Sequence, residues 1–237
     1  MDRGNFPPLR SLPRVFVPGA DPLDVIELPK EEVEKFRKVL RLEEGSQIAV
    51  LPDDGSLIRC EFRARKAHPL GVEWPQTEAS LELTLAQALP KGDRIDTVIH
   101  MCTEIGVTRF VFFGADRSVV RWDQSKRAEK LRRLVAVARE AAEQSFRVKI
   151  PEISFESDLA AVLEQWPEAV VLSEVEHLEA TLESVGTVSV LVVGPEGGWS
   201  PKEIQLIGER GVTLGPRVLR TDTAGPAAAA ILLLKGR

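Results

Sequence analysis

Short apolar runs separated by turn-forming residues occupy the first 75 positions of the chain. These runs predict strands at residues 14–17, 25–28, 47–51 and 57–65. Residues 53–55, Asp-Asp-Gly, fit a hairpin turn between the last two strands, while residues 30–40 space their apolar positions as a helix does. The pattern predicts a small, mainly β domain over residues 1–75, with a linker in the Pro- and Gly-containing stretch 69–78.

The hydrophobic period changes after residue 80. Strand-like runs at 81–86, 109–113, 169–172 and 188–193 alternate with helical spacing at 95–106, 125–146, 159–166 and 201–210. Alternation of strand and helix is typical of an α/β domain with a mostly parallel sheet covered on both faces. We therefore expect a second domain of this class over residues 76–237.

A glycine-rich turn follows the most apolar of these strands, in the sequence Val190-Leu-Val-Val-Gly-Pro-Glu-Gly-Gly-Trp-Ser-Pro-Lys-Glu203. Ser200 and Glu203 form a capping box, with Pro201 at the first helical position. The loop after a strand's carboxyl end is where α/β sheets bind ligands, and the helix start offers N–H groups to a carboxylate or phosphate. A tight turn without a ligand would account for the composition equally well. Neither the dinucleotide pattern nor the P-loop pattern is present.

The last segment combines a polar loop with a helix of small residues. The loop reads Leu214-Gly-Pro-Arg-Val-Leu-Arg-Thr-Asp-Thr-Ala-Gly225, and Pro-Ala-Ala-Ala-Ala-Ile-Leu-Leu-Leu follows it. Small residues let a helix pack closely on its neighbours, and Thr223 is a candidate for its N-cap. By itself, the segment predicts a C-terminal core helix with its cap.

Several motifs in fixed order make the chain resemble the ribosomal RNA small subunit methyltransferase E family, within the SPOUT superfamily. Besides the two loops, they are Lys91-Gly-Asp-Arg-Ile-Asp96, Thr103-Glu-Ile-Gly-Val107, Arg117-Ser118, Glu140-Ala-Ala-Glu-Gln-Ser145 with Arg147, Arg14-Val-Phe16 and Val39-Leu-Arg41. The resemblance covers nearly the whole chain. It departs at Lys35, His100, Met101 and Asp222, where the family usually has other residues.

The resemblance implies a PUA-like RNA-binding domain followed by a SPOUT-type α/β domain, whose residues from about 170 to 237 form a trefoil knot. It also implies a homodimer that methylates N3 of a uridine in 16S ribosomal RNA, free or in the small ribosomal subunit. S-adenosylmethionine would be the cofactor. The cofactor residues carried over by position are Leu172, Ser173, Glu174, Val193, Gly194, Pro195, Glu196, Gly197, Gly198, Leu214, Gly215, Val218, Leu219, Thr221, Thr223 and Ala224.

The charge distribution bears on an RNA substrate. The 237 residues carry a formal net charge of −5, which argues against a polyanionic partner. Residues 150–201, however, hold ten acids and no Lys or Arg, and removing these acids from the total leaves +5 for the remainder. Residues 117–139 alone carry +6. Such a segment is either a phosphate-binding face or a solvated helix face.

Methyl transfer from a sulfonium to uridine N3 requires loss of the N3 proton and alignment of the reactants. The chain contains no Tyr that could act as a base. We expect Arg220 or Arg217 to stabilise the uridine anion instead, because a guanidinium stays charged and aims N–H groups at developing charge. The candidates for RNA phosphate contacts are Arg10, Arg14, Arg41, Arg117, Arg121 and Arg147.

Composition limits the other classes of protein. The chain is 28% charged and has no apolar run of membrane-spanning length, and its first 12 residues lack a signal-peptide core. Two cysteines without ligand spacing predict neither a disulfide framework nor a metal site. We expect a cytoplasmic protein that binds no metal and no membrane. Two rival functions remain open: a non-catalytic RNA-binding module of ribosome assembly, and an α/β enzyme that holds a nucleotide phosphate in the glycine-rich loop.

Overall fold

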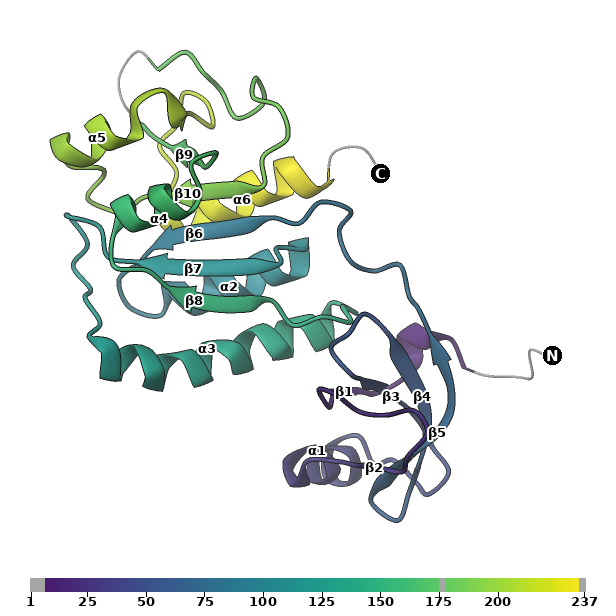
Figure 1. Cartoon of the computed structure of the whole chain (residues 1–237). Coiled ribbons are helices and arrows are strands. Elements are labelled where there is room, and N and C mark those ends of the chain that lie inside the picture. The colour runs from purple at the N-terminus through teal and green to yellow at the C-terminus, as the bar shows by residue number, and fades with distance from the viewer. Residues whose placement is uncertain (1–6, 175–177, 235–237) are drawn as a thin grey trace. The chain divides into compact units, whose positions relative to one another are not determined.

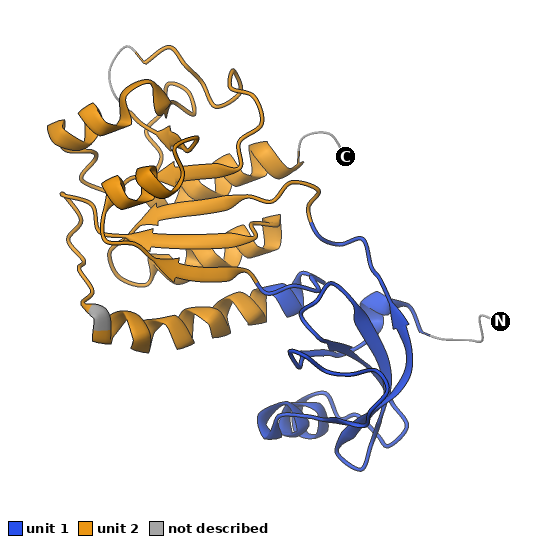
Figure 2. Cartoon of the chain, in the orientation of Figure 1, with its two compact units in different colours: residues 1–78, 142–150 blue, residues 79–141, 151–237 orange. Residues whose placement is uncertain are grey.

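The computed structural model describes residues 7–174 and 178–234 of the chain. Two compact units divide it (Figure 2): one takes in the chain up to Glu78 together with Ala142–Ile150, and the other comprises Ala79–Ala141 and Pro151–Arg237. The expected boundary at residue 75 thus lies three residues early. The expectation also missed that residues 142–150 return to the first unit, because their sequence continues the apolar spacing of the preceding helix.

The first unit is a five-stranded sheet with an apolar cluster on each face. Its strands are β1 (Arg14–Phe16), β2 (Ile26–Glu27), β3 (Gln47–Leu51), β4 (Leu57–Arg63) and β5 (Lys66–Glu73), in the order β1-β3-β4-β5-β2. One cluster includes Val15, Phe36, Ile58 and Phe62. The other includes Phe16, Leu51 and Leu57, together with Ala142 and Val148 from the returning segment. Segment 142–150 is therefore part of this unit's core.

Helices in the first unit are short. A 3-10 turn, η1, covers Leu9–Ser11, and α1 (Lys30–Glu34) continues directly into the wider turn η2 (Lys35–Val39). Together α1 and η2 confirm the helical spacing expected over residues 30–40. Phe36, on this segment, is fully buried and meets Phe62 edge-on, with ring centroids 5.8 Å apart.

Strand β5 corrects the expectation of a linker at residues 69–78. Pro69 and Gly71 lie within β5, and the ladder with β4 shifts register where Arg59 pairs with Gly71 and Cys60 pairs with Pro69. This register shift leaves Leu70 without a partner in the ladder, and bulges are places where strands accommodate proline. The turn before β5 is made by Ala64 and Arg65, both at positive φ. Positive φ at two successive residues is typical of a tight hairpin turn, but Ala and Arg give no turn signal in the sequence.

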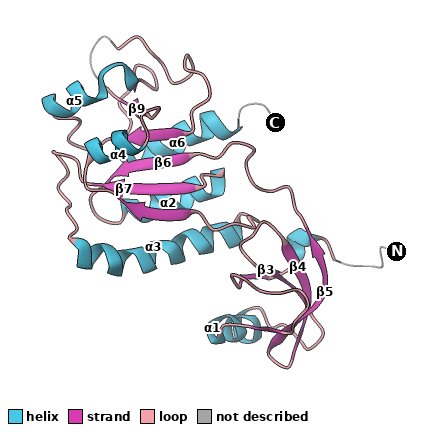
Figure 3. Cartoon of the chain, in the orientation of Figure 1, coloured by secondary structure: helices cyan, strands magenta, loops and turns pink. Residues whose placement is uncertain are grey.

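The second unit is a six-stranded, wholly parallel sheet (Figures 1 and 3). Its strands are β6 (Thr84–Ala88), β7 (Arg109–Phe113), β8 (Glu152–Phe155), β9 (Val170–Leu172), β10 (Val190–Val193) and β11 (Gly211–Val212), in the order β11-β9-β10-β6-β7-β8. The α/β class is confirmed. The short edge strands β8 and β11 were not expected. Only half of the residues of β8 are apolar, so its sequence lacks the pattern of a buried strand.

Helices cover both faces of this sheet (Figure 1). They are α2 (Arg94–Ile105), α3 (Gln124–Gln144), α4 (Leu159–Gln165), α5 (Pro201–Ile207) and α6 (Thr221–Leu234), and a 3-10 turn, η3 (Gly208–Arg210), follows α5. Leu159 and Val162 of α4 and Ile207 of α5 join the core on one face. On the other face, α6 packs against α2, β6 and β10. None of the described helices is both long and apolar enough to cross a membrane.

Two helix boundaries differ from expectation. Helix α6 begins at Thr221, and the backbone N–H groups of Thr223 and Ala224 both donate to the carbonyl of Arg220. The expectation that Thr223 is the N-cap was therefore wrong, since it lies inside the first turn. Helix α5 stops at Ile207 rather than at residue 210, because Gly208 takes a positive φ of 52°.

A buried ion pair fastens the returning segment within the first unit. Glu78 accepts hydrogen bonds from Arg147 at 2.7 and 3.0 Å and from the backbone N–H of Val148 at 2.9 Å. The Arg147 side chain is only 3% exposed. The hypothesis that Arg147 contacts RNA phosphates does not fit this arrangement, because its guanidinium is buried against a carboxylate.

We expect Glu78→Ala to destabilise the first unit, since it leaves the Arg147 guanidinium buried without its carboxylate. Removing one partner of a buried ion pair costs about 3–5 kcal/mol, and we expect a value near the lower end because Glu78 is 23% exposed. Urea unfolding monitored by circular dichroism measures the change. The control, Glu152→Ala, removes the partner of Arg109 from an exposed pair and should leave the unfolding midpoint almost unchanged. Equal shifts for the two variants would contradict the assignment.

Candidate functional site

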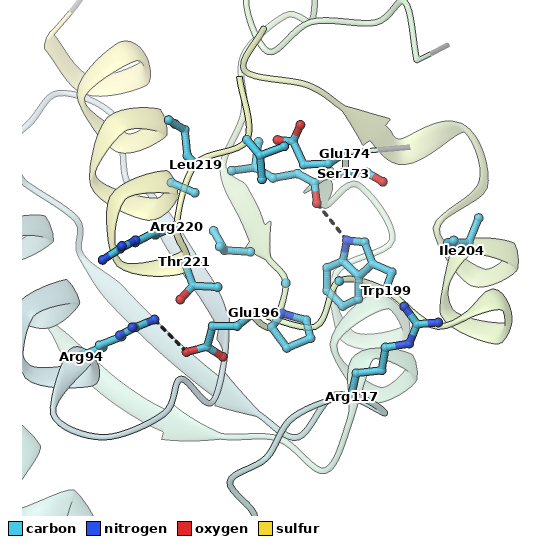
Figure 4. Close-up of a pocket in the computed structure, with 17 residues that line it drawn as sticks. Arg94, Arg117, Ser173, Glu174, Glu196, Trp199, Ile204, Leu219, Arg220 and Thr221 are labelled. Carbon is cyan, nitrogen blue, oxygen red and sulfur yellow. Dashed lines mark hydrogen bonds and ion pairs between the residues drawn. The ribbon is translucent and has the colours of Figure 1, made fainter. Parts of the chain in front are cut away.

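A cavity of about 690 Å³ lies in the second unit, where three loops meet beside the carboxyl ends of β9 and β10 (Figure 4). Its volume lies within the range of about 300–1,000 Å³ that is typical of small-molecule pockets. The loops that line it follow β9, follow β10 and precede α6. This position is the one that the general rule for ligands in open α/β sheets predicts.

The structure brings most of the expected cofactor residues to this cavity. Those that line it are Leu172, Ser173, Glu174, Val193, Gly194, Pro195, Glu196, Gly198, Val218, Leu219, Thr221 and Ala224. Four others do not line it: Gly197, Leu214, Gly215 and Thr223. Of the two arginines expected to be catalytic, Arg220 lines the cavity and Arg217 does not.

Four residues that line the cavity were not expected to, namely Arg94, Trp199, Ile204 and Arg117, the last of which was expected to contact RNA phosphates instead. The first two belong to motifs that the sequence displays, the Lys91–Asp96 segment and the glycine-rich turn. Their positions in these motifs were the only indication in the sequence that they belong to the site. It was not sufficient, because the sequence does not show which side chains of a motif turn toward a ligand.

Trp199 forms one wall of the cavity and dictates glycine at position 194. Its Nε1–H donates to the carbonyl oxygen of Leu172 at 2.9 Å, and its ring stacks on Phe113 with centroids 6.4 Å apart. A Cβ added at Gly194 would lie 2.9 Å from Cε2 of the indole. The indole thus joins the ends of β9 and β10 and excludes any side chain at position 194.

Apolar side chains make up much of the remaining wall. Leu172 and Val193 are buried, whereas Val218 is 80% exposed although it lines the cavity. Thr221 is 7% exposed, and within the described residues its Oγ1 has no hydrogen-bond partner. Partial burial raises the pKa of the Glu174 carboxyl above its usual value. The cavity therefore combines apolar surface with a few polar groups that could meet a ligand.

The start of α5 is closed by its own capping residues. Ser200 Oγ accepts from the backbone N–H of Glu203 at 3.2 Å and donates to Asp116 Oδ2 at 2.6 Å. The Glu203 carboxylate accepts from the backbone N–H groups of Ser200 at 2.8 Å and Asp116 at 2.9 Å. The capping box is confirmed. These contacts occupy the backbone N–H groups of Ser200 and Glu203, which leaves fewer donors at this helix start for a carboxylate or phosphate.

The Glu196 carboxylate is held by a second segment of the chain. It accepts a hydrogen bond from the backbone N–H of Lys91 at 3.0 Å and pairs with Nη1 of Arg94 at 3.3 Å. These contacts join the loop after β10 to the start of α2, about 100 residues earlier in the sequence. The side chain expected to bind a cofactor thus lines the cavity and is also engaged with the protein.

The two cysteines and the possible metal ligands suggest no further chemistry. Cys60 and Cys102 are buried, and burial raises the pKa of both thiols, that of Cys60 to about 12. A thiol with so high a pKa is a poor nucleophile at neutral pH. In the described ranges, no group of three or more His, Cys, Asp or Glu side chains could hold a metal ion.

The remaining arginines expected to contact RNA divide between the two units. Arg10 and Arg41 of the first unit are exposed, while Arg14 is partly buried over the Phe146 ring at 4.0 Å. Burial lowers the pKa of Arg14 to about 10. In the second unit, Arg121 is exposed, and Arg117 donates from Nη1 to the carbonyl of Gly197 at 3.1 Å. Arg10, Arg41, Arg117 and Arg121 are the exposed members of the set, and Arg117 also lines the cavity.

Several known proteins are similar to this chain in both sequence and fold. An RNA methyltransferase domain family matches residues 77–233. The ribosomal RNA small subunit methyltransferase E of Bacillus subtilis is 36% identical over 214 residues, which cover 82% of this chain and 84% of that protein. The enzyme of the same name from Neisseria gonorrhoeae, solved with S-adenosylmethionine, superimposes with a TM-score of 0.83 at 28% identity, over 93% of this chain and 96% of that one. A Legionella pneumophila protein solved with the same molecule gives the same four values.

We expect Gly194→Ala to displace the Trp199 indole and to lower the stability of the second unit. The added Cβ would overlap the ring at 2.9 Å, and overpacking of this kind costs about 1–3 kcal/mol. Thermal unfolding and the tryptophan emission spectrum report both effects. The control is Gly186→Ala, which makes the same chemical change at a position where the added Cβ would meet no atom within 4 Å. An unchanged emission spectrum in Gly194→Ala would show that the indole does not occupy this position.

Proposed function

The chain belongs to the ribosomal RNA small subunit methyltransferase E family, and from that premise we propose that it transfers a methyl group from S-adenosylmethionine to N3 of a uridine in 16S ribosomal RNA. The main support is that the loops that the family resemblance assigns to the cofactor line a single cavity of about 690 Å³. The substrate would be free RNA or the small ribosomal subunit. Because the proposed substrate belongs to the ribosome, we propose that the reaction takes place in the cytoplasm.

The residues of the cavity fit S-adenosylmethionine. Leu172, Val193 and Leu219 offer apolar surface to the flat adenine ring of S-adenosylmethionine. The Glu174 carboxylate offers a polar contact to the ribose or amino acid part of the same molecule. Backbone groups of the loop from Gly194 to Gly198 can approach closely, since glycine places no side chain in the way. When bound, S-adenosylmethionine supplies an electrophilic methyl group on a positively charged sulfur.

In this reaction, the bond between uridine N3 and the methyl carbon forms as the carbon–sulfur bond breaks. The electron pair of that bond stays on sulfur, and the N3 proton passes to solvent. Positioning the two reactants in line supplies much of the rate enhancement. The chain's part is to align the uracil and to stabilise the negative charge that develops as the proton leaves.

Arg220 is the residue to which we assign charge stabilisation. It is exposed, it lines the cavity, and it directly precedes α6. Arg217 shares the loop but does not line the cavity, so we do not assign it a catalytic role. A guanidinium remains charged at working pH and can direct two N–H groups at one carbonyl or anion.

The finer architecture is also part of the proposal. We infer that the first unit is a PUA-like RNA-binding domain, supported by its small, mainly β sheet, and that residues from about 170 to 237 form a trefoil knot. The inference of the knot rests on the chain's membership of the family. We also infer a homodimer. Sedimentation at several concentrations tests the last inference, since a monomer throughout would contradict it.

The test of function is direct methylation of 16S ribosomal RNA purified from a strain that lacks N3-methyluridine. The RNA is incubated with the protein and S-adenosylmethionine, digested to nucleosides and analysed by mass spectrometry. We expect one N3-methyluridine per 16S molecule. Methylation at another atom would refute the N3 assignment. RNA binding without cofactor binding in calorimetry would instead support the non-catalytic module.

We expect Arg220→Ala to lower kcat by about 100-fold or more, the typical loss when one group that stabilises a developing anion is removed. The affinity for S-adenosylmethionine, measured by calorimetry, should change little because the cofactor binds without that charge developing. Arg109→Ala removes an exposed arginine of the same unit that pairs with Glu152, and it should keep full turnover. Undiminished kcat in Arg220→Ala would exclude the assigned role.

We expect Arg121→Ala to weaken binding to all RNA sequences about equally, because a phosphate contact carries no sequence information. The slope of log Kd against log salt should decrease by about one unit. Fluorescence anisotropy with labelled RNA at several salt concentrations measures it. Lys202→Ala, at the end of the acidic segment and exposed, is the charge-matched control. The same slope in both variants and the wild type would remove Arg121 from the RNA surface.

A further inference from the structure

One end of the cavity is distinctly polar. Arg94, Glu196, Thr221 and Arg220 lie together at this end, while Trp199, Ile204 and Arg117 lie on the opposite side (Figure 4). The reaction needs a place for the cofactor and a place for the base that receives the methyl group. Leu172, Val193 and Leu219 are assigned to the cofactor's adenine, which leaves the polar end to be explained.

Arg94 is held at this end by an anchored carboxylate. Glu196 accepts from the backbone N–H of Lys91 at 3.0 Å, and its Oε1 also pairs with Nη1 of Arg94 at 3.3 Å. The backbone contact fixes the carboxylate, and the carboxylate in turn fixes the guanidinium. A guanidinium has five N–H donors in a planar fork. The pair with Glu196 engages one nitrogen, and the Arg94 side chain is 38% exposed at the cavity.

Thr221 gives a second, independent indication that this end receives a ligand. Its side chain lies between Arg220 and Glu196 (Figure 4), it is only 7% exposed, and Oγ1 finds no partner among the described residues. Buried polar groups nearly always have a hydrogen-bond partner. A polar ligand that enters between the two arginines would satisfy this hydroxyl.

We propose, on the basis of the proposed function, that this end binds the pairing edge of the target uracil and that Arg94 donates to one of the two carbonyl oxygens beside N3. Glu196 acts as a positioning residue that orients Arg94. When N3 loses its proton, the negative charge spreads onto both carbonyl oxygens, so a donor fixed there favours the anion. Glu196 thus serves the substrate through Arg94 and does not bind the cofactor through its carboxylate.

The same arrangement accounts for selection of uracil over cytosine. Uracil presents a carbonyl acceptor on each side of N3, whereas cytosine presents an amino donor on one side. Arginine has no acceptor, so Arg94 and Arg220 both match uracil, and one of them would face the amino group of cytosine donor to donor. Unpaired donors in a binding site discriminate strongly against the wrong ligand.

The test compares Arg94→Gln, Arg94→Lys, Glu196→Gln and the double variant Arg94→Gln/Glu196→Gln on two RNAs, one with uridine and one with cytidine at the target position. We expect Arg94→Gln to lower kcat/KM on uridine by about 100-fold and to narrow the preference for uridine over cytidine. The rise of kcat with pH should move to higher pH, because the bound uridine ionises less readily. Affinity for S-adenosylmethionine should stay that of the wild type.

Arg94→Lys keeps the charge but loses the planar fork, so it should fold normally and retain part of the preference. Glu196→Gln should cause a smaller loss in the same direction, and the double variant should be no worse than Arg94→Gln alone, since the glutamate acts through the arginine. The matched control is Arg109→Gln/Glu152→Gln, which alters an exposed pair elsewhere in the unit and should behave as the wild type.

Each outcome decides the proposal. Wild-type kcat/KM and unchanged base preference in Arg94→Gln would overturn it, as would a fully additive double variant or a loss confined to cofactor affinity. A purely structural role for Arg94 would lower the thermal midpoint and reduce activity on both RNAs alike, without moving the pH profile. If the wild type methylates neither RNA, the proposed function has failed and not the role of Arg94.

Discussion

The Trp199 indole occupies the space beside Gly194, and its N–H donates to the carbonyl of Leu172. This contact ties the end of β9 to the loop after β10, and stacking on Phe113 carries it to β7. The loop after β10 therefore needs glycine at position 194, because the indole fills the space that a side chain would occupy. The position of the loop backbone beside the cavity depends on this fit.

Some of the acidic side chains of the second unit are engaged in ion pairs or hydrogen bonds, so the distribution of charge along the sequence does not by itself describe the charge at the cavity. The acidic stretch includes the loop after β10, yet its Glu196 is neutralised by Arg94 from the start of α2, and Glu203 is used within the cap of α5. Arg220 remains exposed at the cavity. A net charge of −5 is thus compatible with an anionic substrate, because Glu196 at the cavity is paired with Arg94 while Arg220 faces the cavity.

The regular second unit was largely predictable, and the errors have specific causes. Buried parallel strands such as β10 are wholly apolar, so their pattern is unmistakable. Strand β5 was mistaken for a linker because it contains Pro69 and Gly71, which a bulge accommodates. The start of α6 was placed too late because Thr223 is a typical cap, although the helix begins at Thr221. The mixed pattern of β8 carries too little signal for an edge strand.

By itself, the sequence determined the α/β class of the second unit, the capping box of α5 and the family, because periodicity, local hydrogen bonding and ordered motifs are properties of contiguous residues. Only the tertiary structure decided that Arg94 and Trp199 line the cavity, that Arg217 does not, and that Arg147 is buried against Glu78. The pairing of Arg94 with Glu196 joins residues about 100 positions apart. No local pattern encodes such a contact, since it arises only when separate strands bring their loops to the same edge of one sheet.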